Sequence, residues 1–326
     1  MCIRDRFKAH ELYRGSVLAK LYFHALRLIK YICLSRLSSR FKLFSYFITS
    51  VENPYDFIFG ILVKSMIKNI LYIQAPFWHS LKVHHRLLLK FISILFRKVN
   101  IHLVFNSKNM MLDATKSPLG KYFLKKHSLK ASIVEPVPKI INTGPLPQSK
   151  DDIISIIGRI SPEKRMHLGI IAFHRVLLKI KNPKLKLFIV GEVNDKKYLQ
   201  LLRRLIRKYR LCNNVFIITD NVKNSIRNIY AKSKVLWNFS EGFFGLVNIE
   251  AMSFGTVPIV TEGCSDTIKN NYSGFVAYTL KDFIDITVKI LENEKIWQKI
   301  SKNSYDFSKK FSITRFNRKL LNIITE

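Results

Sequence analysis

From Asp151 onward the chain alternates short apolar, β-branched runs with segments of helical periodicity, and this alternation constrains its fold more than any other feature. Strands are expected at residues 153–157, 185–190, 215–219, 235–239 and 257–260, and helices at 167–180, 197–209, 223–232 and 245–254. Strands that alternate with helices build a parallel sheet with crossover helices. We therefore predict an α/β fold in which this part of the chain forms one Rossmann-like domain.

A proline-rich segment precedes that domain. Residues 135–150 read EPVPKIINTGPLPQSK and hold four prolines and one glycine, a composition that resists both helix and central strand. With 326 residues, the chain can bury two hydrophobic cores. We expect an N-terminal domain, a linker, a C-terminal domain and a last helix, at residues 1–138, 139–150, 151–310 and 311–326. Upstream of the linker, strands are expected at residues 69–73 and 101–105, and Asn106-Ser107 after the second strand marks the expected start of a helix.

The segment from Ser240 to Gly255, SEGFFGLVNIEAMSFG, places two carboxylates around a glycine turn that opens a helix. Gly245 and Leu246 can present backbone N–H groups to an anion, and the positive end of the helix dipole points the same way. Glu250, further along the helix, can accept hydrogen bonds from a pair of ribose or sugar hydroxyls. An ordinary buried helix with Glu250 in a salt bridge fits this segment equally well.

A second segment, IISIIGRISPEKR at residues 153–165, delivers cations to the loop after a predicted strand. Arg159 can bind two phosphate oxygens at once, and Lys164 supplies a point charge for a diphosphate. The plainer alternative is that both are solvated residues at a strand end. Gly158, Gly191 and Glu241 also follow predicted strand ends, and ligands of open α/β sheets bind at that edge.

In this order, the two segments resemble the retaining GT-B glycosyltransferases of family 4, also called glycosyl transferases group 1. The matching features are a Gly-Arg-x-x-x-x-Lys loop and a pair of glutamates about one helix apart. The resemblance implies two Rossmann-like domains facing a cleft, with the last helix packing back across the first domain. It also implies that Arg159 and Lys164 hold the donor diphosphate and that Glu250 holds the ribose. Glu241 would lie at the donor sugar.

The sequence departs from the family pattern in three places. Glu241 and Glu250 are nine positions apart, which leaves eight residues between them instead of seven, and the extra residue lies at Phe243 or Phe244. Arg165 stands where the family usually has glycine. No N-terminal strand with a glycine-rich loop is recognisable before Val51, so we expect an N-terminally truncated member with an incomplete first domain.

The upstream segments YIQAPFW and FNSKNM resemble mannosyltransferases that extend lipid-linked oligosaccharides. The resemblance therefore implies transfer of a hexose, with mannose favoured, from a GDP-sugar or UDP-sugar to a lipid-linked or polysaccharide acceptor. We expect no cofactor and no metal, since no Asp-x-Asp string is present. A phosphorylase or epimerase on the same fold stays open. A paired-carboxylate hydrolase using the two glutamates would leave Arg159 and Lys164 without a role.

The chain is strongly basic, with a net charge of +33 from 55 Lys and Arg against 22 Asp and Glu. Residues 12–51 and 57–112 contain no acidic residue, and their cations are interleaved with apolar side chains. Such stretches suit peripheral contact with an anionic membrane, and we expect the protein on the cytoplasmic face. Compositional drift is the alternative explanation of the charge, and we favour it less. A non-enzymatic basic protein that binds membrane or nucleic acid is the alternative function, although we find no nucleic-acid motif.

The remaining reactive side chains are weak candidates. The four cysteines lack metal-type or disulfide-type spacing and indicate free thiols in a reducing compartment. His79 lies in a segment that could line a cleft, but we favour a surface or core position over a catalytic role. Asp266 lies beside the expected donor loop.

Overall fold

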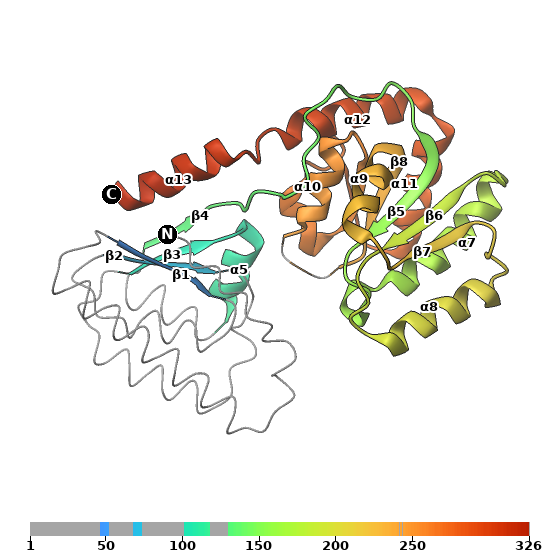
Figure 1. The fold of residues 1–326 in the computed structure, drawn as a ribbon. Coiled ribbons are helices and arrows are strands. Elements are labelled where there is room, and N and C mark those ends of the chain that lie inside the picture. Colours follow the sequence, from blue (N-terminus) through green and yellow to red (C-terminus); the bar gives the residue numbers. More distant parts are fainter. Residues whose placement is uncertain are drawn as a thin grey trace. The chain divides into compact units, whose positions relative to one another are not determined.

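The structure is a computed structural model that describes residues 46–51, 68–73, 101–117, 130–240, 242 and 244–325 (Figure 1). The chain divides into two compact units, one of residues 1–134 with 321–326 and the other of residues 135–320. The unit boundary precedes the predicted linker at 139–150, and the four-part division expected from the sequence stays a prediction. Within the described part of the chain, every helix is too short or too polar to span a bilayer.

The first unit contains a four-stranded parallel sheet in the order β1-β2-β3-β4. Its strands are β1 (Tyr46–Val51), β2 (Lys68–Ile73), β3 (Ile101–Phe105) and β4 (Lys130–Ile133). The predicted strands at 69–73 and 101–105 are confirmed. The predicted helix start is confirmed too, because Ser107 caps α5 (Lys108–Lys116) by accepting a hydrogen bond from the Met110 N–H.

Two strands of this sheet lie where the sequence pattern gave no signal. β1 occupies residues just before Val51, where we recognised no strand, and β4 follows a segment without clear alternation. β4 has only four residues, and β1 lies at the end of the acid-free basic stretch 12–51. Pairing with a neighbouring strand, rather than local pattern, defines such strands.

The second unit is built on a six-stranded parallel sheet in the order β10-β9-β8-β5-β6-β7. The strands are β5 (Asp151–Ile157), β6 (Lys186–Val190), β7 (Val215–Ile218), β8 (Ser233–Asn238), β9 (Val257–Thr261) and β10 (Phe275–Ala277). The helices are α7 (Met166–Ile180), α8 (Lys196–Lys208), α9 (Val222–Lys232), α10 (Leu246–Ser253), α11 (Leu280–Glu292) and α12 (Glu294–Ser308). The last helix, α13 (Ile313–Thr325), contains the boundary between the two units, which falls after Leu320. The predicted Rossmann-like domain is therefore confirmed, to within two residues at each predicted end, with β10 as the strand that the sequence pattern did not indicate.

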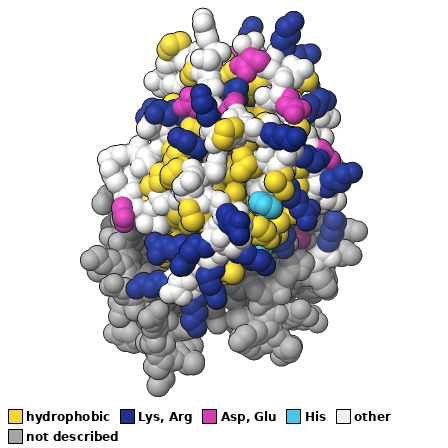
Figure 2. Space-filling model, turned by 90° about the vertical axis from the view of Figure 1, so that its right-hand side faces the viewer, with side chains coloured by type: hydrophobic (Ala, Val, Ile, Leu, Met, Phe, Trp, Pro, Cys, Tyr) yellow, Lys and Arg dark blue, Asp and Glu magenta, His cyan; other side chains and the backbone are white. Residues whose placement is uncertain are grey.

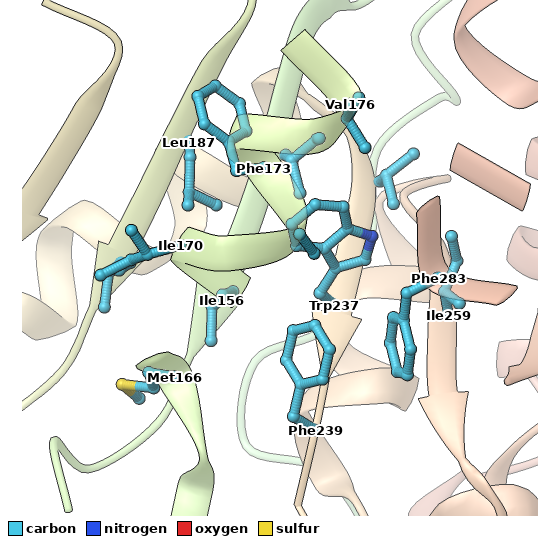
Figure 3. Close-up of a cluster of buried hydrophobic side chains, with 14 of the residues drawn as sticks. Ile156, Met166, Ile170, Phe173, Val176, Leu187, Trp237, Phe239, Ile259 and Phe283 are labelled. Carbon is cyan, nitrogen blue, oxygen red and sulfur yellow. The ribbon is translucent and has the colours of Figure 1, made fainter. Parts of the chain in front are cut away.

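The main core of this unit lies between the sheet and the layer formed by α7, α8 and α11. Figure 3 shows Phe239 and Phe283 beside Trp237, and the two phenyl rings stack with centroids 4.1 Å apart. The indole N–H of Trp237 donates to Thr287 Oγ1 at 2.9 Å, so this buried side chain leaves no unpaired polar atom. A second cluster, on the other face, joins α9 and α10 to the sheet.

The carboxyl ends of β5 and β6 are held unusually close together. Gly158 N–H donates to Val190 O at 3.0 Å, and Ile160 N–H donates to Glu192 O at 2.9 Å, which extends the pairing beyond the strands. A Cβ atom on Gly191 would lie 1.7 Å from Gly158 O. Only glycine fits at position 191, because the clash would be with backbone that cannot rotate away.

The linker is fastened to the second unit by a buried lysine. The Lys150 ammonium donates to Tyr230 O at 2.7 Å, Ser233 O at 2.9 Å and Thr256 Oγ1 at 2.7 Å. These three neutral acceptors match the three donors of an ammonium group. Because none of them carries a charge, burial lowers the pKa of Lys150 well below its usual value.

Gly191→Ala tests the contact between the ends of β5 and β6. We expect a loss of about 1–3 kcal/mol in the free energy of unfolding, because the methyl group must displace backbone. Denaturant unfolding measures it. Gly144→Ala is the matched control, since its Cβ would come no closer than 3.4 Å to Asn142 Oδ1. Equal stability of the two variants would contradict the close approach.

The buried state of Lys150 predicts a pH dependence. The unfolded state binds more protons than the folded state between the lowered pKa and the ordinary lysine value of about 10.4, so stability rises with pH in that window. We expect the stability of the wild type relative to Lys150→Met to increase as the pH rises toward about 10 in denaturant unfolding. The exposed Lys299→Met should show no such trend. A constant difference would mean that the ammonium is not desolvated.

Candidate functional site

The loop after β5 brings a lysine to the loop after β8. A short 3-10 turn, Pro162–Lys164, follows Ser161 and leads directly into α7. From this turn the Lys164 ammonium lies 3.4 Å from Ser240 Oγ, which it can reach as a hydrogen-bond donor. Lys164 and the β8 loop, two segments that the sequence places in one site, are thus neighbours at the carboxyl edge of the sheet.

Arg159 lies in the same loop but points to a carboxylate. Its guanidinium is 3.8 Å from Glu163 Oε1, and the two side chains are 60% and 54% exposed. An ion pair so open to water contributes little to stability. The guanidinium can therefore exchange Glu163 for another anion at small cost.

The backbone after β8 is held in place by hydrogen bonds to its carbonyl groups. Thr261 Oγ1 donates to Ser240 O at 2.5 Å, and the Cys264 thiol donates to Gly242 O at 2.9 Å. Burial raises the pKa of Cys264 to about 11, although the nearby charge of Lys164 pulls in the opposite direction. The thiol therefore keeps its proton at neutral pH and acts as a donor in this loop.

A buried amide network fixes the start of α10. The Asn238 side-chain amide donates to Asn248 Oδ1 at 2.9 Å, and the Asn248 amide donates to Thr267 Oγ1 at 2.8 Å. These amides fill the space beside Gly245, where a Cβ atom would lie 2.5 Å from Asn248 Nδ2. Gly245 is the N-cap and has no side chain to satisfy the first-turn N–H groups of α10, including that of Leu246. These groups can receive an anion.

Glu250 is buried, with 8% of its surface exposed, and its carboxylate connects three segments. Tyr230 on α9 donates its phenol to Oε2 at 3.1 Å. The linker N–H groups of Lys139 and Ile140 donate to Oε1 at 3.3 and 3.4 Å. Burial raises the pKa of Glu250, and these hydrogen bonds oppose the rise. The predicted alternative of a salt bridge is absent from the described contacts of this residue.

Residues 140–307 match the model of the family described as Glycosyl transferases group 1, which covers just over half of the chain. The chain belongs to this family. The predicted family membership is thus confirmed.

Two curated relatives show how far the similarity extends. The poly(glycerol-phosphate) alpha-glucosyltransferase of Bacillus subtilis (strain 168) is 26% identical over 224 residues, which are 65% of this chain and 31% of that protein. The GDP-Man:Man(3)GlcNAc(2)-PP-Dol alpha-1,2-mannosyltransferase of Dictyostelium discoideum is 21% identical over 198 residues, which are 57% of this chain and 39% of that protein. The chain therefore spans only roughly a third of the length of the curated relatives it matches.

A solved structure extends the similarity of fold. The crystal structure of Anabaena Alr3699/HepE in complex with UDP-glucose superposes with a TM-score of 0.67 at 13% identity, covering 90% of this chain and 81% of that chain. At this identity the likeness shows the fold alone. It confirms the predicted α/β, GT-B class, with parallel Rossmann-like sheets over most of the chain.

The structure explains one departure from the family pattern. Arg165 has φ 48° and ψ 32°, a left-handed conformation in which glycine is favoured. This residue joins the 3-10 turn to α7, so the position demands a backbone reversal whatever its side chain. The family usually has glycine here because the backbone must adopt a left-handed conformation. Arg165 adopts the same conformation with some strain.

Several predicted residues lie outside the described residues. They include Glu241 and Phe243, so the position of the extra residue between the two glutamates stays a prediction, as does the role of Glu241. Phe244 is described and lies 6.2 Å from Phe311, centroid to centroid. His79, the whole of 12–45 and most of 57–112 are also outside the description. In the described ranges, no three His, Cys, Asp or Glu side chains gather as a metal site would require.

Sequence reasoning missed the residues that support the site. Asn238 ends an apolar strand and Asn248 interrupts an apolar helix, and a polar residue in such a register signals a buried partner. Tyr230 gave no comparable signal, because tyrosine is equally common in cores without a carboxylate partner. The bonds to Lys139 and Ile140 come from backbone and are invisible in sequence.

The hydrogen bond from the Tyr230 phenol to Glu250 leads to a prediction for the free energy of unfolding of the Tyr230→Phe variant. Because the carboxylate loses a donor while it stays buried, we expect a cost of about 1.5–3 kcal/mol at neutral pH. The cost should shrink as the pH falls through the raised pKa of Glu250, since a protonated carboxyl needs the bond less. Denaturant unfolding at several pH values measures both effects.

Glu250→Gln provides the matched background for a double-mutant cycle. In that background Tyr230→Phe should cost clearly less, and the difference between the two backgrounds gives the coupling free energy of the pair. A cost of Tyr230→Phe that is the same in both backgrounds and at all pH values would show that lost packing, and not the carboxylate, is responsible.

Proposed function

We propose that this chain acts as a retaining glycosyltransferase, which moves a hexose from a nucleotide-diphosphate sugar to a lipid-linked or polysaccharide acceptor. The observation that carries the proposal is the approach of Lys164 to Ser240, which joins the loops after β5 and β8 at the carboxyl edge of the sheet. This edge is where open α/β sheets bind their ligands. The matched family model spans both loops.

The donor diphosphate would lie between Lys164, Arg159 and the first turn of α10. When the glycosyl–phosphate bond breaks, negative charge grows on the leaving diphosphate while the anomeric carbon becomes electron-poor. Preorganised cations and helix N–H groups stabilise that charge more in the transition state than in the ground state. Lys164 is held by Ser240, whereas Arg159 must first leave Glu163. We assign both residues to diphosphate binding, with Gly158 and Gly191 shaping the loop.

Glu250 would hold the ribose of the donor. Its carboxylate has about four acceptor positions and three donors in the described contacts, two of them long bonds from linker N–H groups. One ribose hydroxyl can take the remaining acceptor position, and a second can replace a linker N–H group. Gly245 and Leu246 complete the donor site at the start of α10, and Glu241 would contact the transferred sugar.

The identity of the sugar is the least constrained part of the proposal. The upstream motifs favour mannose. Of the two curated relatives, one is a glucosyltransferase and the other is a mannosyltransferase. We therefore propose a hexose carried by UDP or GDP, and direct comparison of UDP-glucose with GDP-mannose as donors separates the two.

The proposal includes metal-independent transfer and peripheral contact with an anionic membrane at its cytoplasmic face. Lys164, Arg159 and the α10 N-terminus supply positive charge that a divalent ion supplies in other transferases, so chelation by EDTA should leave turnover unchanged. Membrane contact is supported by the excess of 55 Lys and Arg over 22 Asp and Glu. Such a location would bring the enzyme to a lipid-linked acceptor.

Two alternative functions would give different experimental results. A phosphorylase or epimerase of the same fold would release a sugar phosphate or an epimer of the donor without an acceptor. A non-enzymatic basic protein would bind vesicles or nucleic acid with steep salt dependence and would show no thermal shift with UDP or GDP. The family membership favours transfer over both.

Donor binding provides the direct test. We expect Lys164→Met and Arg159→Met each to weaken UDP or GDP binding by about tenfold to a hundredfold, because each removes a charge-assisted hydrogen bond to phosphate. Thermal shift and calorimetry measure the affinity, and release of UDP or GDP in the presence of acceptor measures turnover.

Lys184→Met is the matched control for these two variants. Lys184 is an exposed cation just before β6, at the amino edge of the sheet, so its loss should leave the affinity unchanged. Normal nucleotide binding by Lys164→Met would overturn the assignment of the diphosphate site. Binding without transfer to any glycan or lipid-linked acceptor would overturn the proposed activity.

A further inference from the structure

The outer face of α8 is covered with cations. The helix reads KKYLQLLRRLIRK, and its six Lys and Arg residues are all exposed while Tyr198, Leu202 and Ile206 are buried. The exposed cations are Lys196, Lys197, Arg203, Arg204, Arg207 and Lys208. Among the described residues, no carboxylate forms an ion pair with any of them. The helix carries no acidic residue, so its outer face is positive along its whole length.

Exposed leucines lie among these cations. Lys197, Leu201, Arg204 and Lys208 follow one another at spacings of four, three and four, which places them on one stripe of the helix. Leu201 is 36% exposed in the middle of this stripe. Leu178 on the neighbouring helix α7 is 64% exposed.

The end of α8 lies beside the part of α7 that carries Leu178. The rings of His174 on α7 and Tyr209 just after α8 are 4.8 Å apart, and Leu178 follows His174 by one helical turn. Figure 2 views the molecule from the side of α7 and α8 and shows Lys and Arg side chains around exposed hydrophobic ones. We call the residues Lys197, Leu201, Arg204, Lys208 and Leu178 the α8 surface.

The positive charge of the α8 surface is not explained by the basic composition of the whole chain alone. Helices α11 and α12 of the same unit are also exposed, but they mix charges and carry acidic residues. Asp282, Asp285 and Glu292 lie on α11, and Glu294 and Asp306 lie on α12. Helices α7, α9 and α13 also lack acidic residues, but they carry two, three and three Lys or Arg residues, against six on α8.

We infer that the α8 surface is a docking face for an anionic lipid bilayer. Each cation near such a surface contributes about 1 kcal/mol through the negative surface potential. Cations alone would fit any polyanion, but the two exposed leucines fit a bilayer, into which apolar side chains insert below the headgroups. A polyphosphate chain offers nothing to a leucine.

The position of α8 gives this contact a functional meaning. The Tyr198 hydroxyl accepts a hydrogen bond from the His167 N–H at 3.1 Å, at the start of α7 and three residues after Lys164. The loop before α8 also bonds to the loop after β5, because the Asn194 and Asp195 N–H groups donate to Ile160 O. A bilayer bound at α8 would therefore hold the diphosphate loop at a fixed distance from lipid. This inference rests on the membrane contact that we proposed above.

Co-sedimentation of the full chain with vesicles tests the inference. We expect the triple variant Lys197→Gln, Arg204→Gln, Lys208→Gln to lower the partition onto phosphatidylcholine vesicles containing phosphatidylglycerol by about a hundredfold. The control Lys295→Gln, Lys299→Gln, Lys302→Gln changes the charge equally on α12 and should bind almost as the wild type does. All six positions are exposed. Equal losses in the two triple variants would overturn the inference.

The leucines distinguish lipid from other polyanions. Leu178→Ser with Leu201→Ser should weaken binding to the same vesicles severalfold and leave binding to inorganic polyphosphate unchanged. If the double variant binds vesicles as the wild type does while the α8 triple variant loses polyphosphate binding, the surface recognises a soluble polyanion and the lipid assignment fails.

Donor binding, measured without vesicles, separates this inference from the proposed activity. The α8 variants should bind UDP or GDP normally, because none of the substituted side chains belongs to the assigned donor site. Absence of nucleotide binding by the wild type would overturn the proposed function and would leave the vesicle result intact.

Discussion

The buried carboxylate of Glu250 is the interaction on which the geometry of the candidate site depends. Burying a charged group is costly unless hydrogen bonds replace its hydration. Here the phenol of Tyr230 and the backbone N–H groups of Lys139 and Ile140 replace the hydration of the carboxylate. Tyr230 lies on α9, and Lys139 and Ile140 lie in the linker. The linker, α9 and α10 are therefore positioned by one side chain. We assign Glu250 to the ribose, and the same carboxylate accepts hydrogen bonds from the linker. Donor binding and the position of the linker would therefore depend on one acceptor group.

The carboxyl edge of the sheet meets a second constraint, which is close approach. Gly191 lets the ends of β5 and β6 come together, and Gly245 leaves space for the amides of Asn238 and Asn248. Both contacts restrict the movement of the backbone at this edge. Backbone N–H groups that are already oriented can stabilise developing negative charge without reorganisation. The loop that carries Lys164 is tied to this frame through Ile160, whereas Arg159 is held only by an exposed ion pair. The site thus combines a fixed cation with an adaptable one.

Sequence alone was sufficient for the parts of the fold that are local. The periodicity of apolar residues predicted the strands and helices of the second unit, because each of these elements buries apolar side chains at regular spacings. The two motif segments predicted the loops at the carboxyl edge of the sheet. What sequence could not supply were pairings between distant segments. The partner of Glu250 lies twenty residues away on another helix, and Asn248 reaches Thr267 across nineteen residues. The preference of position 165 for glycine became clear only from its left-handed backbone conformation, with φ at 48°. Short strands such as β4 and β10 exist through their neighbours and carry too few residues to show a period.

The distribution of charge in the second unit separates two tasks that both require cations. A donor diphosphate needs few charges in fixed positions, and in our proposal Lys164 would meet this need, because it lies in a short turn and 3.4 Å from Ser240 Oγ. A bilayer needs many charges whose exact positions matter little, and in our proposal the exposed side chains of α8 would meet that need, because no carboxylate in the described structure restrains them. The two sets lie in adjacent segments, linked through Tyr198 and the start of α7. A high net charge therefore says little about function by itself. The function depends on which cations the fold restrains and which it leaves exposed.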